Sequence, residues 1–267
     1  PTGGDPNRKA LNLHHGVLVS DSFMRAVETN SQWALKSPKD GVVQSTVSAR
    51  NLWIRLLTAR VETGEPYIIF VDTVNRLIPQ HHKLAGLNVR TSNLCSEITL
   101  PTDEDRTAVC CLSSVNLAKY DEWSTSPTFI PDMIKMLDNV LEHFIQSTYD
   151  FSYDFQGKVL SMKVKEGMEG FTKAGYSAYR ERSLGLGAMG FHTYLQKLNV
   201  PFDSPIATGQ NIKMFRQIKE LATKTSIELA EERGEAPDME GTGMRNAHLL
   251  AIAPNATSSI ICGGTSP

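Results

Sequence analysis

The segment "TSNLCSEITLP", residues 91–101, carries a side-chain amide, a thiol and a carboxylate at alternate positions. Successive side chains of an extended segment point to opposite faces, so we expect Asn93, Cys95 and Glu97 to share one face of a strand. An unpaired carboxylate buried on that face would cost several kcal/mol. The three polar groups therefore need water, a polar partner or a ligand.

The same alternation places Leu94, Ser96 and Ile98 on the opposite face, where the two apolar side chains are expected to pack against the core. From the residues alone, two interpretations of the polar face remain. In the first, Cys95 is a small buried filler and Glu97 faces solvent at a sheet edge. In the second, both belong to one site. A Cys-x-Glu sequence taken by itself favours the first interpretation.

Short apolar runs and amphipathic helical patterns alternate along the rest of the chain. The run "YIIFVD" (67–72) is typical of a strand buried on both faces. "GLGAMG" (185–190) lacks the preceding strand and the acidic residue of a dinucleotide loop, so it indicates close backbone packing. The alternation predicts an α/β fold with a largely parallel sheet, open or closed as a barrel. The expected strands are 15–20, 67–72 and 246–254, and the expected helices are 21–35, 45–64 (ended by Gly64), 129–151, 180–198 (with a Gly-rich entry) and 205–234 (ended by Gly234).

The composition argues against several classes of protein. A net charge of −2 with no basic face argues against nucleic-acid binding, and no apolar run is long enough to cross a bilayer. Four cysteines in 267 residues are too few for a disulfide scaffold, and neither they nor the adjacent histidine pairs have metal-ligand spacing. We therefore expect no metal site and a reducing, cytoplasmic location. The chain begins without methionine and ends after a Gly-rich turn, which suggests a piece of a longer polypeptide.

Two neighbouring motifs narrow the class. "SNLCSEITLPT" followed by "AVCCLSSVNLAKYDEW" resembles the large, catalytic subunit of class I ribonucleotide reductase, with the phage or bacterial type as the nearest. Four further segments resemble the same family in the same order: "HHGVLVSDSFMRAV", "TGEPYIIFVDTVN", "YRERSLGLGAMGFHTYLQ" and "LLAIAPNATSSIICGGTSP". The resemblance implies that residues 1–267 form a single domain, a part of the ten-stranded α/β barrel with a central finger loop.

The resemblance also implies a chemistry for the opening segment. Cys95 would be the radical cysteine, whose thiyl removes the 3′ hydrogen of a ribonucleotide. Glu97 would be the general base for the 3′ hydroxyl, a task that burial assists by moving a carboxyl pKa toward working pH. Asn93 would hydrogen-bond the sugar hydroxyl. The enzyme class implied is ribonucleoside-diphosphate reductase, which supplies deoxyribonucleotides for DNA synthesis, and a piece on its own would be inactive.

Two further groups of residues acquire roles from the resemblance. Cys110 would be one half of the reducing thiol pair; the family's other half lies on an early barrel strand that has no match here. A rival alignment gives the role to Cys111, which is otherwise a filler.

Thr257, Ser258 and Ser259 follow an apolar run and open a helix, so their hydroxyls and amides suit an anion. Taken by themselves these residues favour an ordinary helix cap, but the resemblance implies binding of the substrate diphosphate.

The expected partners follow from the same family. They are a ribonucleoside diphosphate, a metal-containing small subunit that supplies the radical, thioredoxin or glutaredoxin as reductant, and a second large subunit. No cofactor is expected in this chain, and neither nucleic acid nor a membrane is an expected partner. The residues do not decide between a diphosphate and a triphosphate as the substrate. They also allow a second hypothesis, in which the chain is a nucleotide-binding or scaffolding piece that is active only when it assembles with separately encoded segments. A thiol-redox binding protein using Cys110 and Cys111 is disfavoured because a disulfide between neighbours is strained.

Overall fold

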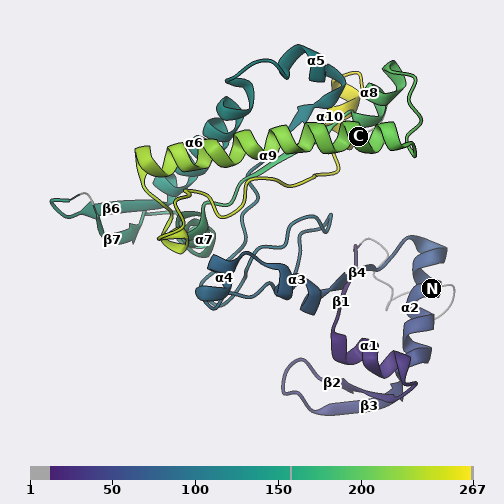
Figure 1. Ribbon diagram of the computed structural model, residues 1–267. Coiled ribbons are helices and arrows are strands. Elements are labelled where there is room, and N and C mark those ends of the chain that lie inside the picture. The colour runs from purple at the N-terminus through teal and green to yellow at the C-terminus, as the bar shows by residue number, and fades with distance from the viewer. Residues whose placement is uncertain (1–12, 157, 266–267) are drawn as a thin grey trace. The chain divides into compact units, whose positions relative to one another are not determined.

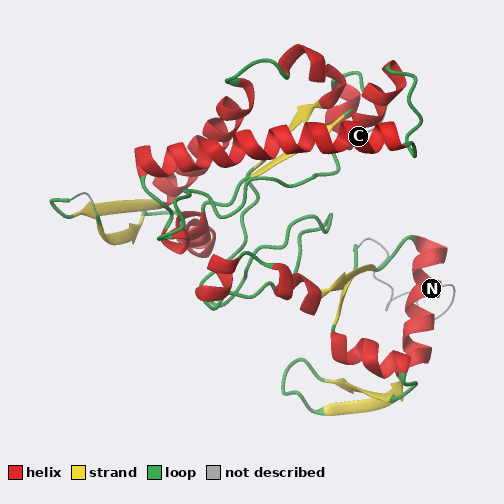
Figure 2. Cartoon of the chain, viewed as in Figure 1, coloured by secondary structure: helices red, strands yellow, loops and turns green. Residues whose placement is uncertain are grey.

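The computed structural model describes residues 13–156 and 158–265 (Figure 1). They gather into two compact units: 13–78 with 89–99, and 79–88 with 100–265 apart from 157. Each unit combines helices with strands (Figure 2), so the predicted α/β class is confirmed. The expectation that 1–267 form one domain stays a prediction. No helix of the described residues is long and apolar enough to cross a membrane.

The first unit consists of two strand pairs and three helices among the described residues. In chain order these are β1 (Gly16–Val19), α1 (Asp21–Glu28), β2 (Gln32–Lys36), β3 (Val43–Ser48), α2 (Ala49–Thr63), β4 (Tyr67–Phe70) and α3 (Val71–Leu77). β1 pairs with β4 in parallel, and β2 pairs with β3 antiparallel. A small core of Val19, Phe23, Val27 and Ala49 lies between these elements.

The helix predicted over 21–35 is wrong beyond Glu28. Asn30 adopts a left-handed conformation with φ +51°, which ends the helical path, and β2 follows. Trp33 then packs edge-on against Phe23 with ring centroids 5.2 Å apart. Cross-strand pairing and this aromatic contact override the local helical pattern.

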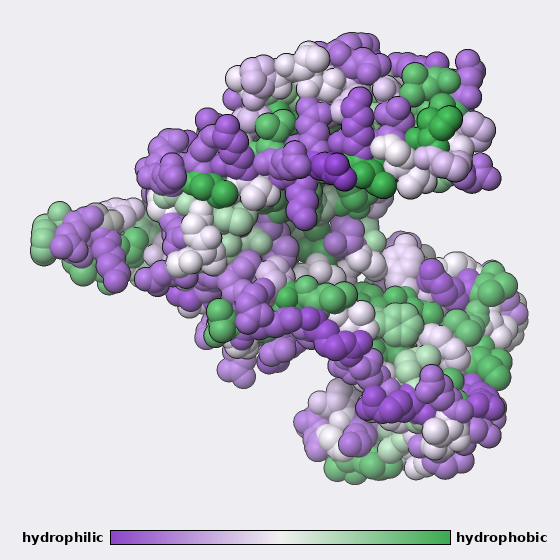
Figure 3. Space-filling model, in the orientation of Figure 1, coloured by the Kyte–Doolittle hydropathy of each residue, from purple (hydrophilic) through white to green (hydrophobic). Residues whose placement is uncertain are grey.

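The helix predicted over 45–64 begins late and ends where expected. Residues 45–48 belong to β3, and Ser48 caps α2 by accepting a hydrogen bond from the Asn51 amide. Gly64 closes the helix with φ +79°, a conformation that glycine adopts without a steric penalty. α2 exposes Ile54, Leu57 and Val61, and Figure 3 shows apolar side chains gathered over this helix.

The expectation of a strand buried on both faces at 67–72 is wrong. β4 covers only Tyr67–Phe70, and Phe70 is 44% exposed. Among the described residues, the sheet of β1 and β4 has two strands. Burial on both faces requires a wider sheet with helices on each side.

The second unit is arranged around the parallel pair β5 (Leu112–Asn116) and β8 (Gly185–Met189), with Leu112 opposite Gly185. Long helices α6 (Phe129–Thr148) and α9 (Pro205–Arg233) contact one another over this pair (Figure 1). The remaining elements are α4 (Gln80–Leu84), η2 (Leu117–Lys119), α5 (Tyr120–Trp123), β6 (Tyr149–Tyr153), β7 (Val159–Val164), η3 (Glu169–Phe171), α7 (Thr172–Glu181), α8 (Phe191–Lys197), η4 (Pro237–Met239) and α10 (Ala256–Ile261).

Both long helices were predicted correctly in type, and α9 in extent, but α6 ends at Thr148 and residues 149–151 of the predicted helix belong to β6. The buried side of α6 repeats every three or four residues, as a helix packed on one face requires. Its buried apolar side chains are Ile130, Ile134, Leu137, Leu141 and Ile145. α9 starts at Pro205 behind the Ser204 cap and stops before Gly234.

The predicted strand at 246–254 is reduced to one bridge, between Leu186 and Leu250. The helix predicted over 180–198 is wrong for residues 182–190, because β8 occupies 185–189 and α8 begins at Phe191. The glycines of 185–190 pack closely, as expected. A Cβ on Gly187 would lie 2.4 Å from the Ala251 carbonyl oxygen. Ala251 can therefore approach β8 closely only because Gly185 and Gly187 have no side chains.

Asp138 is fully buried on α6 and is surrounded by cations from three other segments. Its carboxylate accepts hydrogen bonds from Arg182 Nε at 3.1 Å, Arg245 Nε at 2.9 Å and Arg233 Nη1 at 3.2 Å, and from the side-chain Nδ2 of Asn246 at 3.1 Å. Burial opposes ionisation most strongly, but the arginines outweigh it and hold the pKa of Asp138 below its ordinary value. The cluster ties α6 to the ends of α7 and α9.

Gly187→Ala is expected to destabilise the second unit by about 1–3 kcal/mol, because the added methyl must displace backbone. Gly209→Ala is the matched control: it lies inside α9 with open space around it, so it should stabilise by about 0.5–1 kcal/mol. Urea midpoints followed by Trp123 fluorescence, in a Trp33→Phe and Trp53→Phe background, measure both. Equal effects of the two substitutions would show that β8 and 251 do not approach closely.

Asp138→Asn is expected to cost about 3–5 kcal/mol, because it leaves buried arginines without their counter-charge. The lowered pKa sets the sign of the pH dependence: the stabilisation is complete above the ordinary value of 3.8 and is lost as pH falls through the lower folded-state value. Urea unfolding of the same tryptophan background between pH 7 and pH 2 should show this acid loss in the parent and not in the variant. Glu231→Gln, exposed on α9, should change neither the free energy of unfolding nor its dependence on pH.

Candidate active-site loop and redox cysteine

The segment 91–101 is a loop with a turn at 94–96 and not a strand, and its residues up to 99 belong to the first unit. The Ser96 amide donates to the Asn93 carbonyl oxygen at 3.2 Å, and Ser96 has φ +68°. A chain that reverses direction here does not alternate its side chains between two faces. The predicted strand is therefore wrong, while the loop that the family resemblance implied is present.

The Asn93 side chain closes this loop. Its Oδ1 accepts a hydrogen bond from the Ile98 amide at 3.1 Å and faces Ser92 Oγ at 3.3 Å. Ile98 is buried, as expected, but Leu94 is 63% exposed, which contradicts its expected place against the core. With Oδ1 engaged in the loop, the Asn93 amide NH₂ is the part of this side chain suited to a ligand.

Cys95 and Glu97 differ in their surroundings. Cys95 is exposed, which contradicts its interpretation as a buried filler. Glu97 is half-buried, and its Oε2 is shielded from solvent with no hydrogen-bond partner among the described residues. A shielded carboxylate oxygen without a partner is costly. A ligand hydroxyl that donated to this oxygen would remove that cost.

Asn75 fixes the base of the loop, and no pattern in the sequence indicated this residue. Its Oδ1 accepts from the Val89 amide at 2.8 Å, and its Nδ2 donates to the Val89 carbonyl oxygen at 2.9 Å. The same Nδ2 donates to the Val71 carbonyl oxygen in α3. The Asn75 side chain thus makes the two backbone hydrogen bonds that a neighbouring strand would make with Val89, two residues before the loop begins. A lone asparagine in a helix carries no signal of such a contact, because its partner is 14 residues away.

Cys110 and Cys111 lie in the second unit and have opposite environments. Cys110 is exposed, whereas Cys111 is 7% exposed and its Sγ donates to the Leu137 carbonyl oxygen at 3.4 Å. Burial raises the pKa of the Cys111 thiol, and the nearby Asp138 charge adds to the effect. A thiol that exchanges electrons has to be reached and ionised. These facts favour Cys110 over Cys111, although the redox role itself stays a prediction.

The hydroxyls at 257–259 stand at the start of the short helix α10. Thr257 and Ser258 are exposed, but Ser259 is buried and donates to the Ala256 carbonyl oxygen at 2.9 Å. The N-cap residue Asn255 makes no side-chain cap bond, because its Nδ2 donates to the carbonyl oxygens of Ala188 and Ala253. The helix start is thus held against the end of β8, with no side-chain cap on its first turn.

The predicted residues fall into two groups. Asn93, Cys95 and Glu97 belong to one loop of the first unit, whereas Cys110 and residues 257–259 belong to the second. That these two groups meet on one substrate stays a prediction.

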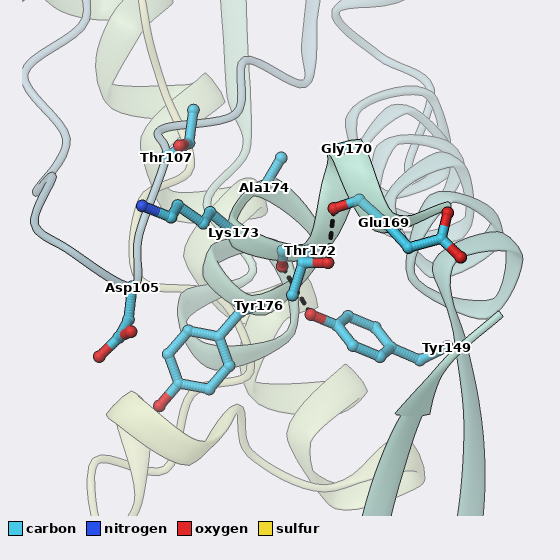
Figure 4. A pocket seen from close by; sticks show the side chains of 9 residues that line it. All are labelled: Asp105, Thr107, Tyr149, Glu169, Gly170, Thr172, Lys173, Ala174 and Tyr176. Carbon is cyan, nitrogen blue, oxygen red and sulfur yellow. Dashed lines mark hydrogen bonds between the residues drawn. The ribbon is translucent and has the colours of Figure 1, made fainter. Parts of the chain in front are cut away.

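A cavity of about 450 Å³ in the second unit contains none of the predicted residues (Figure 4). Tyr149 Oη donates to the Thr172 carbonyl oxygen at 2.6 Å on one side of it, and Lys173 lines it from α7. Its lining is Asp105, Thr107, Tyr149, Glu169, Gly170, Thr172, Lys173, Ala174 and Tyr176. The side chains in Figure 4 carry charges of both signs, Lys173 against Asp105 and Glu169.

Comparison with known proteins defines the class. Residues 2–242 match the family model described as "Ribonucleotide reductase, barrel domain". The chain belongs to this family, and the sequence resemblance is confirmed.

Within the family, its similarities are to large subunits. It is 51% identical, over its whole length, to 44% of a Frog virus 3 protein provisionally named as a ribonucleoside-diphosphate reductase large subunit. It is 40% identical to the ribonucleoside-diphosphate reductase large subunit of Invertebrate iridescent virus 3, covering 99% of the chain and 48% of that relative. The solved class Id ribonucleotide reductase alpha subunit of Actinobacillus ureae superposes with TM-score 0.78 at 35% identity, covering 95% of the chain and 42% of that structure. The chain thus spans less than half the length of these relatives.

The different exposures of the thiols predict their reactivity. Iodoacetamide applied to the native protein should label Cys95 and Cys110 at least about tenfold faster than Cys111, because a buried thiol with a raised pKa yields little accessible thiolate. Mass spectrometry of peptides at increasing times measures each rate, and labelling in urea provides the reference in which the rates converge. Fast native labelling of Cys111 would contradict its packed position.

Proposed function

We propose that this chain carries the radical-bearing part of a ribonucleoside-diphosphate reductase large subunit, which reduces ribonucleotides to deoxyribonucleotides. The observation that supports it most is the loop itself: an exposed Cys95, with the shielded and unpartnered Glu97 carboxylate oxygen two residues away. Membership of the barrel family supports the same chemistry. The names of its relatives, ribonucleoside-diphosphate reductase large subunits, favour a diphosphate over a triphosphate.

In the proposed reaction, the Cys95 thiyl takes the hydrogen atom from C3′ of the ribose, so the S–H bond forms as the C3′–H bond breaks. Sulfur suits this step because it holds an unpaired electron without a formal charge. Glu97 accepts the proton of the 3′ hydroxyl through its unpartnered oxygen. The Asn93 NH₂ donates to a sugar hydroxyl, while its Oδ1 keeps the loop closed through Ile98.

The 2′ hydroxyl then takes up a proton and leaves as water, and two thiols supply the two electrons and two protons of the reduction as they form a disulfide. Cys95 gives its hydrogen atom back to C3′, which restores the thiyl, and Glu97 returns its proton to the 3′ oxygen. Cys110 is the thiol of this chain assigned to the disulfide-forming pair. Its exposed position allows a small dithiol protein, thioredoxin or glutaredoxin, to restore the reduced state. Cys111 packs against Leu137 and takes no part.

The substrate diphosphate is assigned to the first turn of α10. Thr257 and Ser258 present exposed hydroxyls there, and first-turn amides favour anions. Ser259 belongs to the same predicted site, but its hydroxyl is engaged with Ala256, so we assign it the support of the turn and not a phosphate contact.

The proposed partners complete the reaction. A small subunit with a metal-generated radical oxidises Cys95, and a second large subunit forms the dimer. No cofactor is assigned to this chain itself, and the proposed location is the cytoplasm, which is that of the host if the source is a virus.

The decisive test is the turnover of the full-length protein, reconstituted with its small subunit and a thioredoxin system. Cys95→Ser should lower deoxyribonucleotide formation by about three orders of magnitude or more, because no neighbouring group replaces the thiyl. Substrate affinity, measured by calorimetry, should stay within about twofold. Cys262→Ser, an exposed thiol with no assigned role, should retain full turnover. A Cys95→Ser protein with most of its activity would refute the proposed role of this loop.

A further inference from the structure

Three side chains from distant parts of the sequence meet inside the second unit. They are His82 of α4, Glu181 at the end of α7 and His248 in the segment that leads to the Leu250 bridge. One ligand atom from each lies within 4.8 Å of the other two. His82 and Glu181 are almost fully buried, at 0% and 2% exposure.

His82 lies close to one carboxylate but makes no hydrogen bond with it. Neither of its ring nitrogens makes a hydrogen bond among the described residues, although Nε2 lies 3.5 Å from Glu181 Oε2. Most buried polar side-chain atoms are hydrogen-bonded, and an unsatisfied one costs about 1–3 kcal/mol. A fully enclosed imidazole whose nitrogens make no hydrogen bond would therefore gain from a bound ligand.

The other two side chains are already oriented. Ser183 Oγ donates to Glu181 Oε2 at 2.9 Å and lies 3.1 Å from His248 Nδ1. The His82 and His248 rings are 5.1 Å apart, centroid to centroid. Second-layer hydrogen bonds of this kind fix the orientation of metal-binding carboxylates and imidazoles.

The charges around the cluster suit a cation. Burial lowers the pKa of His82 to about 3, with help from His248, and that of His248 to about 4, so both imidazoles are neutral and able to ligate. Burial also raises the pKa of Glu181 to about 7, which a bound cation would reverse. The charge of the nearby Arg106 is offset by two carboxylates, Asp238 at 2.6 Å and Asp103 at 3.9 Å.

We propose that His82, Glu181 and His248 form a site for one divalent transition-metal ion, of which zinc fits best. Two imidazoles and a carboxylate are a ligand set that zinc uses when it keeps one further position for water. With bonds of about 2.0–2.1 Å, tetrahedral ligand atoms lie about 3.3 Å apart, so the present spacing must close by at most about 1.5 Å.

The proposed ion cross-links α4, the α7–β8 junction and the segment paired with β8. α4 has no strand pairing with the other two segments, so the ion would stabilise the second unit without taking part in the reaction. The proposal does not depend on the activity proposed above.

The test is metal binding by the full-length protein after dialysis against a chelator. Titration with Co²⁺ should give visible d–d bands of a four-coordinate nitrogen and oxygen site, without the near-ultraviolet band of a thiolate ligand. One equivalent of Zn²⁺ should abolish the bands. Zn²⁺ should also raise the melting temperature, because it binds the folded chain.

Variants locate the ion. His248→Gln, at the partly exposed ligand, and His82→Gln should each weaken Zn²⁺ affinity by about tenfold or more, as measured by competition with a chromophoric chelator. Both should lose the thiolate-free Co²⁺ bands. His143→Gln, exposed on α6, should bind as the parent does. If His82→Gln fails to fold by circular dichroism, His248→Gln alone decides.

Two results would overturn the proposal. One is a parent protein that shows no thiolate-free Co²⁺ bands and no rise in melting temperature with Zn²⁺. The other is a folded His248→Gln protein with parental affinity and spectrum, which would place any bound ion elsewhere.

Discussion

The second unit depends on one buried carboxylate. Asp138 lies on the inner side of α6, and Arg182, Arg233 and Arg245 reach it from three other segments. A buried charge is tolerable only with its partners in place. The requirement therefore fixes where α7 ends, where α9 ends and how the chain returns at 245–246.

This cluster also holds a strained residue. Arg182 follows α7 with φ +45°, a conformation that costs a residue with a side chain of the order of 1 kcal/mol or more. Its guanidinium donates to Asp138 and to Glu142 at 2.6 Å, which offsets that cost. The turn at Arg182 directs the chain into β8, where glycines let residues 249–251 come close. Cys111, bonded to Leu137 beside Asp138, is packed by the same arrangement, and this leaves its neighbour Cys110 at the surface.

The loop at 91–101 follows a different principle. Its shape comes from side-chain amides that replace backbone partners: Asn93 closes the turn on Ile98, and Asn75 holds Val89 at its base. Such a loop can present a thiol and a carboxylate at adjacent points without burying either in a sheet. The metal site proposed in the second unit also depends on a polar side chain for its shape, since Ser183 orients two of its three ligands.

The sequence by itself determined the α/β class, the two long helices and the identity of the family. These predictions rest on local signals, which depend only on residues close together in the chain. The signals are helical periodicity, the helix ends at Gly64 and Gly234, and the "NLCSEI" motif. Only the tertiary structure decided that 91–101 is a loop, that β2 replaces the end of a predicted helix, and that 246–254 forms a single bridge. It also decided that His82, Glu181 and His248 meet. These outcomes depend on partners far away in the chain, and contacts between distant residues arise only when the backbone has been placed.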